Sequence, residues 1–205
     1  MAADTGRRGG GRSYHHGDLP AALIRTSFEL LAEHGPAEFS VAKVARRLGI
    51  STAAPYRHYS DRDHLLAAVA ATAARDLADA VRAAADRAGD DPVDRFAAAG
   101  GVYARFAVER GVGFDVIYAP ELEGLRDETL AEAGRALMDL LTDLAEAVDG
   151  RAKVDALDLV EHLVVLAHGY VSLYRDGFFA RGSRRSLDDI VAKVTRAVGE
   201  LAARS

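Results

Sequence analysis

Residues 39–66 read FSVAKVARRLGISTAAPYRHYSDRDHLL, and this stretch decides the fold. Within it, apolar residues from Val41 to Leu48 recur at the i, i+3, i+4 and i+7 spacing of one helix stripe. Ala45 is small enough for a second helix to cross closely, and Gly49 permits the positive φ that a tight turn needs. The stretch therefore predicts a helix-turn-helix unit.

The second short helix of this unit is expected over residues 52–59, with Ser51 as its N-cap. Small residues at its N-terminus would let the backbone approach DNA, and the amides there attract a phosphate. Pro55 removes one backbone hydrogen bond, and we expect it to face inward or sideways. On an isolated helix such side chains would merely be solvated, but the preceding turn and the following capped helix favour DNA reading.

The order of motifs resembles the DNA-binding segment of TetR-type transcriptional repressors, over about residues 19–70. The Ala-Pro-Tyr-Arg-His run is similar to one subgroup of that family. Later stretches, YARFAVERGVGFDVIYAPEL and LAHGYVSLYRDGFF, resemble the C-terminal domain of one large subgroup. The residues that carry the first resemblance are Val44-Ala45, Leu48-Gly49-Ile50-Ser51, Tyr56-Arg57-His58-Tyr59 and Arg62-Asp63-His64-Leu65-Leu66.

The resemblance implies a set of DNA contacts. The phosphate contacts would come from Ser40, Thr52, Tyr56 and His58. Thr52, Ala53 and Arg57 would face the bases. The arginine could hydrogen-bond to guanine or bind the phosphate backbone of the DNA. Arg62 stands where the family often has a lysine, so it would bind a further phosphate.

Helix signals continue to the end of the chain, and no alternating strand pattern interrupts them. We expect an all-α protein of about nine helices, in which Ser60 and Asp63 begin a long Ala-rich helix. Three regions follow: a flexible Gly/Arg-rich arm over 1–17, which could also be a minor-groove arm, a helix-turn-helix DNA-binding domain over 18–66, and a ligand-binding and dimerisation domain over 67–205.

The charge is divided unevenly between these regions. The net charge of −5 opposes a nucleic-acid partner on average, but residues 1–64 hold 9 Lys and Arg against 7 Asp and Glu. Residues 65–205 hold 17 Lys and Arg against 24 Asp and Glu, so the excess of acidic residues lies in the C-terminal region. The absence of cysteine excludes disulfides, thiolate metal sites and a cysteine nucleophile.

No metal, cofactor or catalytic motif is expected. His162 and His168 are six positions apart and do not share a helix face, unlike the i, i+4 ligands of helical zinc sites. Residues 1–17 lack the apolar run of a secretory signal, and no stretch approaches 18 uninterrupted apolar residues. We therefore expect a cytoplasmic protein without a membrane partner.

The resemblance also implies an effector pocket and a dimer. The composition of the body suggests a small apolar or aromatic effector. The candidate lining residues are Phe106, Phe114, Tyr118, Leu141, His162 and Tyr170. The candidate homodimer interface lies on the apolar stripes of the last two helices, and comprises Leu159, Leu163, Leu166, Val191, Val194 and Val198.

Together these features predict an effector-responsive transcriptional repressor, not an enzyme, that binds a palindromic operator as a dimer and is released by a small organic ligand. The alternative from another class is an all-α ligand-binding or enzymatic protein in which the N-terminal helices are structural only.

Overall fold

The computed structural model describes residues 19–111, 115–119, 122–148, 153–180 and 185–204. These residues form α-helices and short 3₁₀ turns and contain no strand, so the all-α prediction is confirmed. The predicted arm and Phe114 lie outside the described residues. The α-helices are α1 (Leu19–His34), α2 (Val41–Leu48), α3 (Arg62–Arg87), α4 (Pro92–Arg110), α6 (Glu128–Glu146), α7 (Lys153–Arg175) and α8 (Leu187–Arg204).

The described residues hold seven α-helices, where the sequence predicted about nine in the whole chain. One short segment expected to be helical, residues 52–59, contains the 3₁₀ turn η2 (Pro55–Arg57) instead, and another 3₁₀ turn, η3 (Val116–Tyr118), lies between α4 and α6. Two further 3₁₀ turns, η1 (Pro36–Glu38) and η5 (Phe178–Ala180), lie in connections.

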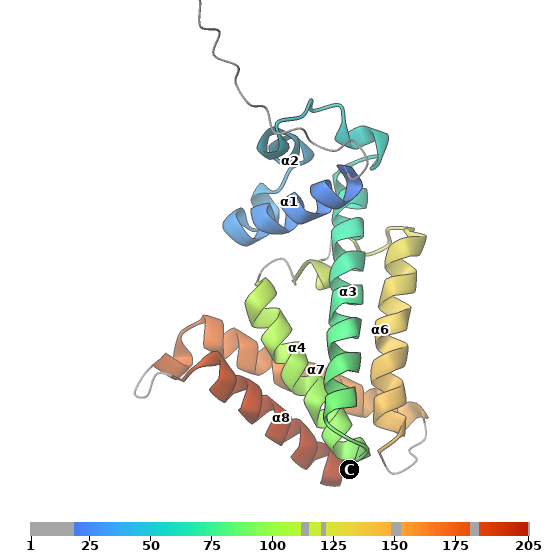
Figure 1. Ribbon diagram of the computed structural model, residues 1–205, viewed down its shortest axis with the longest axis vertical. Coiled ribbons are helices and arrows are strands. Elements are labelled where there is room, and N and C mark those ends of the chain that lie inside the picture. The colour runs from blue at the N-terminus through green and yellow to red at the C-terminus, as the bar shows by residue number, and fades with distance from the viewer. Residues whose placement is uncertain (1–18, 112–114, 120–121, 149–152, 181–184, 205) are drawn as a thin grey trace, which may run out of the picture.

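The helices form a small head and a larger body joined by one long helix. Figure 1 shows α1 and α2 at one end of the molecule, with α3 running from them into the body beside α6. Helices α4, α7 and α8 gather at the opposite end, where the chain terminates. A stiff 26-residue helix therefore links the two parts.

The head has its own apolar core. Leu23 and Leu31 of α1 and Val44 of α2 are fully buried against the first turns of α3, where Leu65 and Leu66 lie. Two residues from much later in the chain complete the same cluster. They are Val116 of η3 and Leu122.

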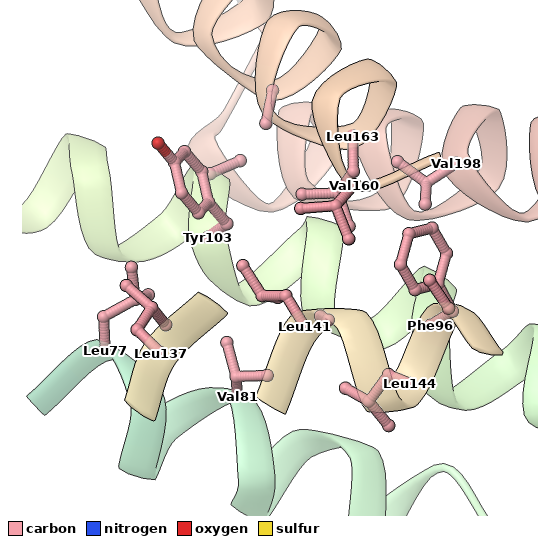
Figure 2. Packing of buried hydrophobic residues seen from close by; sticks show 14 of the residues in the cluster. Leu77, Val81, Phe96, Tyr103, Leu137, Leu141, Leu144, Val160, Leu163 and Val198 are labelled. Carbon is pink, nitrogen blue, oxygen red and sulfur yellow. The ribbon is translucent and has the colours of Figure 1, made fainter. Parts of the chain in front are cut away.

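The body core is built from five helices (Figure 2). Its large, fully buried side chains include Leu77, Phe96, Tyr103, Leu141 and Leu163. The closest helix crossing in this core is that of α4 on α8, where Gly100 and Gly101 face Val198 and Thr195.

Side-chain caps fix where the helices begin. Ser186 and Asp189 form a reciprocal cap on α8, since the Asp189 N–H donates to Ser186 Oγ at 3.1 Å and the Ser186 N–H donates to Asp189 Oδ2 at 2.8 Å. The predicted start of α3 was wrong by one residue. Asp61, not Ser60, is the N-cap, because its carboxylate accepts the His64 N–H at 2.9 Å.

Helix α7 is long and apolar enough, by length and composition alone, to cross a membrane over Asp155–Arg175, with a mean hydropathy of 1.3. Its Leu159, Leu163 and Ala167 are buried in the body core, as in the core helix of a soluble protein. Only 33% of this apolar window is buried, however, so much of the helix presents apolar surface outward.

Candidate nucleic-acid interface and effector cleft

The first helix and the turn of the helix-turn-helix form as predicted. Ser40 caps α2 by accepting the Lys43 N–H at 3.2 Å. Gly49 ends the helix in the left-handed conformation with φ of 68°. The Ile50 N–H then reaches back to the Ala45 carbonyl at 3.0 Å, which closes the turn.

The second helix of the unit differs from the prediction. Residues 52–59 contain turns and the 3₁₀ element η2 instead of a regular α-helix. Pro55 has no N–H to donate to the Ser51 carbonyl, so the Ala54 N–H takes that acceptor at 3.0 Å and the turn tightens. The Ser51 side chain caps nothing in η2, whose N-cap is Ala54. Pro55 itself is buried, as expected.

The segment that follows the turn is a row of exposed side chains. Thr52, Ala53, Arg57 and His58 are exposed, and Tyr56 is 54% exposed despite its large apolar ring. Figure 1 places the segment at the end of the head away from the body. Within the part of the chain that the structure describes, Arg57 forms no ion pair. A cation and an aromatic hydroxyl are thus presented together to solvent.

Two of the three cations of α2 are paired with acids of the head. Arg47 donates two hydrogen bonds to Glu33, at 3.0 and 2.7 Å, and Lys43 donates one to Glu38 at 3.0 Å. These hydrogen bonds hold the pKa of each glutamate below its usual range. The third cation, Arg46, is exposed and donates to the Ala42 carbonyl at 3.2 Å, so the surface charge available to a phosphate backbone comes from Arg46 on α2 and from Arg57 beside η2.

Arg62 is only partly available to an external partner. Its guanidinium donates to the carbonyls of Pro36 at 3.0 Å and Phe39 at 3.4 Å, and pairs with Asp63 at 3.0 Å. It also lies over the Phe39 ring, 5.9 Å from the centroid. Arg62 thus fastens the start of α3 to the connection before α2.

The structure does not gather the predicted effector residues into one site. Leu141 is fully buried in the body core and His162 is exposed on α7, so neither lines the cleft described below, and both stay predictions. Phe106 packs against the body core under the Arg110 guanidinium, and Tyr170 stacks on Phe179 at 5.9 Å. Only Tyr118 of the described candidates lines a cleft of the body.

That cleft, called here the effector cleft, has a volume of about 500 Å³ and lies between η3 and α6. Sequence reasoning missed its other residues, because the connection from α4 to α6 has no helical periodicity from which facing side chains can be chosen. The lining comprises Ala74, Ile117, Tyr118, Ala119, Leu122, Glu123, Leu130, Gly134, Leu137 and Met138.

Comparison with protein families covers both parts of this architecture. The family described as "Bacterial regulatory proteins, tetR family" matches residues 23–69, and "Tetracyclin repressor-like, C-terminal domain" matches residues 96–198. The chain belongs to the tetR family. The first match contains the helix-turn-helix, and the second contains all of the residues that line the effector cleft except Ala74.

Individual relatives agree with this assignment. The chain is 40% identical over 75 residues to the HTH-type transcriptional regulator Mb1846 of Mycobacterium bovis, a match that covers 37% of this chain and 30% of that relative. A structure of a protein of unknown function from Rhodococcus sp. RHA1 covers 93% of this chain and 98% of its own, at 28% identity and a TM-score of 0.75. A tetR-family regulatory protein from Rhodococcus RHA1 has the same fold at 18% identity and a TM-score of 0.68, covering 89% of this chain and 96% of its own.

The apolar stripes predicted for dimerisation of this tetR-family protein are mostly internal. Leu159, Leu163, Val194 and Val198 are buried within the protomer and offer almost no surface to a second copy, while Leu166 and Val191 are half-buried. The opposite face of α7 is exposed instead. It carries Leu157 at 42%, Val165 at 62% and Leu173 at 41% exposure.

A second cleft of the tetR-family protein, of about 530 Å³, lies where η2 and α3 meet the start of α6. Its lining includes His58, His64 and Asp127. The Asp61 carboxylate accepts the His64 backbone N–H and also lies 2.9 Å from His64 Nδ1, and these two contacts lower the pKa of Asp61 to about 2. The side-chain contact raises the pKa of His64.

Proposed function

We propose that this protein is a dimeric, effector-responsive transcriptional repressor of the cytoplasm that binds a palindromic operator. The observation that carries the proposal is the exposed row from Thr52 to His58, presented by a helix-turn-helix whose turn and first helix are fully formed. We assign DNA binding to residues 18–66, and ligand binding and dimerisation to 67–205.

The DNA contacts follow from position and chemistry. Thr52, Ala53 and Arg57 face base edges, where a guanidinium can bind guanine through two hydrogen bonds. Tyr56 and His58 bind phosphate, and Ser40 binds phosphate at the N-terminus of α2. Arg62, which also contacts Pro36, Phe39 and Asp63, binds a further phosphate at the start of α3. The stiff Ala-Pro-Tyr-Arg-His segment is the feature that this chain shares with one subgroup of the family.

Dimerisation uses the exposed face of α7 defined by Leu157, Val165 and Leu173. Each step of eight residues rotates about 80° around the helix, so the three side chains spread over about 160° of its exposed half, with Val165 at the centre. An apolar helix that the protomer leaves largely uncovered fits burial against a second copy. Two reading segments per dimer also supply affinity that one short segment lacks.

Binding-site selection from random DNA tests the proposal directly. We expect a palindrome whose affinity falls steeply with salt, because phosphate contacts release counterions. Arg57→Ala should lower affinity for the selected site by about 1–3 kcal/mol and relax specificity at one base pair. Tyr56→Phe should weaken binding to all sequences alike. Arg82→Ala, an exposed change on α3, is the matched control that should leave binding unchanged.

The competing function is an all-α ligand-binding or enzymatic protein with a purely structural head. It predicts that no selected sequence outcompetes bulk DNA at any salt concentration. Equal loss on all base variants for Arg57→Ala would remove the base-reading role from that residue while leaving DNA binding in place.

A further inference from the structure

Three aromatic side chains from three separate elements form a hydrogen-bond chain beside the effector cleft. The Tyr103 hydroxyl of α4 lies 2.7 Å from the Tyr118 hydroxyl of η3 and 3.0 Å from Nδ1 of His168 on α7. The His168 ring also packs against both tyrosine rings, with centroids 5.4 Å from Tyr103 and 5.2 Å from Tyr118. Polar atoms are thus grouped at one point of an otherwise apolar body.

The chain begins inside the protein and ends at the cleft. Tyr103 is 1% exposed, and in Figure 2 its hydroxyl oxygen points away from the labelled apolar side chains. Tyr118 lines the cleft and is 51% exposed. Burial raises the pKa of both hydroxyls, so both stay protonated at neutral pH. Tyr118 therefore meets a ligand as a neutral hydroxyl that can donate or accept.

The rest of the cleft selects against most polar molecules. Its walls are formed by Ile117, Leu122, Leu130, Leu137 and Met138, which contribute no polar side-chain group other than a weakly accepting thioether sulfur. Glu123 is the one charged residue of the described lining, and it is exposed. A negatively charged ligand would meet this carboxylate without a cation to balance it, whereas a neutral or positively charged one would not be opposed.

The hydroxyls of the chain order one another. Tyr103 has a single hydroxyl hydrogen, so it donates to one neighbour and accepts from the other. When His168 Nδ1 accepts, Tyr118 donates its hydrogen to Tyr103. When His168 Nδ1 carries a proton and donates, Tyr103 donates to Tyr118, and the Tyr118 hydrogen is directed to a further acceptor. A ligand acceptor in the cleft therefore favours the His168 tautomer with hydrogen on Nδ1.

We propose that the chain Tyr118–Tyr103–His168 is the polar recognition element of the effector cleft, and that the cleft takes a largely apolar molecule with one uncharged or cationic hydrogen-bonding group. This inference rests on the proposed function, because the protein must respond to an effector for the cleft to be its effector site.

Naphthalene, 1-naphthol, 1-naphthylmethylamine and 1-naphthoate are suitable probes, because they share one ring system and differ in a single group. Their binding to the full-length protein is measured by fluorescence titration. We expect 1-naphthol to bind about five- to tenfold more tightly than naphthalene, which is the net value of one hydrogen bond. The naphthoate should bind more weakly than naphthalene, and the protonated amine should not.

Variants assign the preference to the chain. Tyr118→Phe should abolish the advantage of 1-naphthol over naphthalene, and Tyr103→Phe should reduce it. Tyr174→Phe, an α7 tyrosine outside the chain, is the matched control and should keep it. The nitrogen chemical shifts of His168 supply a readout that does not depend on affinity: 1-naphthol should change the tautomer ratio, towards hydrogen on Nδ1 if its hydroxyl accepts from Tyr118 and away from it if its hydroxyl donates to Tyr118, whereas naphthalene should leave the ratio unchanged.

The outcomes separate the inference from the proposed function. Equal binding of naphthalene and 1-naphthol, an advantage that survives in Tyr118→Phe, tightest binding of the naphthoate, or no binding of any probe would each overturn the inference. Operator binding is measured independently by gel shift, so loss of sequence-specific DNA binding would overturn the repressor assignment without altering the probe result.

Discussion

The crossing of α4 on α8 gives a sharp prediction about stability. A Cβ added at Gly100 would lie 2.7 Å from Val198 Cγ2, 3.3 Å from its Cβ and 3.4 Å from its Cγ1. Val198 is fully buried, and rotation about its Cα–Cβ bond only exchanges one methyl group for the other. Gly100→Ala therefore forces the two helices apart or distorts the valine.

The magnitude follows from two opposing effects. Overpacking a filled core costs about 1–3 kcal/mol. Replacing glycine by alanine inside a helix returns about 1 kcal/mol. We expect Gly100→Ala to lower the free energy of unfolding by about 1 kcal/mol, up to about 2, and the melting temperature by about 2–4 °C per kcal/mol in a chain of this size.

Urea denaturation followed by circular dichroism, at one fixed protein concentration, measures this change. Gly134→Ala on α6 is the matched control, because a Cβ there has no neighbour within 4 Å and the substitution should be neutral or stabilising. In Gly100→Ala combined with Val198→Ala the two losses should not add, since the smaller side chain makes room for the new methyl group. The reasoning would be refuted if Gly100→Ala were as stable as the wild-type protein, or if the losses of the two single variants added up in the double variant.

Three further predictions concern the cap, the dimer and the core. The pKa of Asp61 is lowered to about 2, so its contribution to stability is complete above its ordinary value of 3.8 and is lost as the pH falls through 2. The pKa of His64 is raised, so its contribution to stability is complete below pH 6.5 and is lost as the pH rises through the pKa of His64 in the folded protein. Asp61→Asn removes both contributions, so it should flatten the acidic and the neutral limb of a plot of melting temperature against pH. Val165→Glu should convert the dimer to monomers in analytical ultracentrifugation, and a retained dimer would place the interface elsewhere. Leu141→Ala should cost about 2–5 kcal/mol of stability while the folded protein binds 1-naphthol normally, and a selective loss of binding would return Leu141 to the pocket.

Local rules predicted the helix boundaries well, because each boundary depends on one or two residues. Ser40 and Gly49 bound α2, and each does so through a contact within four positions in the sequence. The start of α3 shows where such rules stop. Ser60, Asp61 and Asp63 are all good capping residues, and only the path of the chain in space decides that the Asp61 carboxylate meets the helix.

The site was harder to predict because its chemistry depends on burial and on long-range contacts. An apolar stripe containing Leu163 looks the same in sequence whether it meets its own chain or a second copy, and here it meets its own. Tyr103 and His168 are 65 positions apart, so no spacing rule relates them. Pro55 was correctly placed inside, yet its effect on the whole second helix was underestimated.

Val116 has a consequence for how the DNA-reading part folds. This valine is 3% exposed in the core of the head, although fifty residues separate it from Leu66, its neighbour in that cluster. The head therefore completes its interior only after the chain has closed a long loop, which is a slow, entropically costly step. A fragment ending at residue 66 would lack this plug together with most of α3, so the reading segment is not an independent folding unit. Nascent chains gain a finished DNA-binding surface only once the body has begun to assemble.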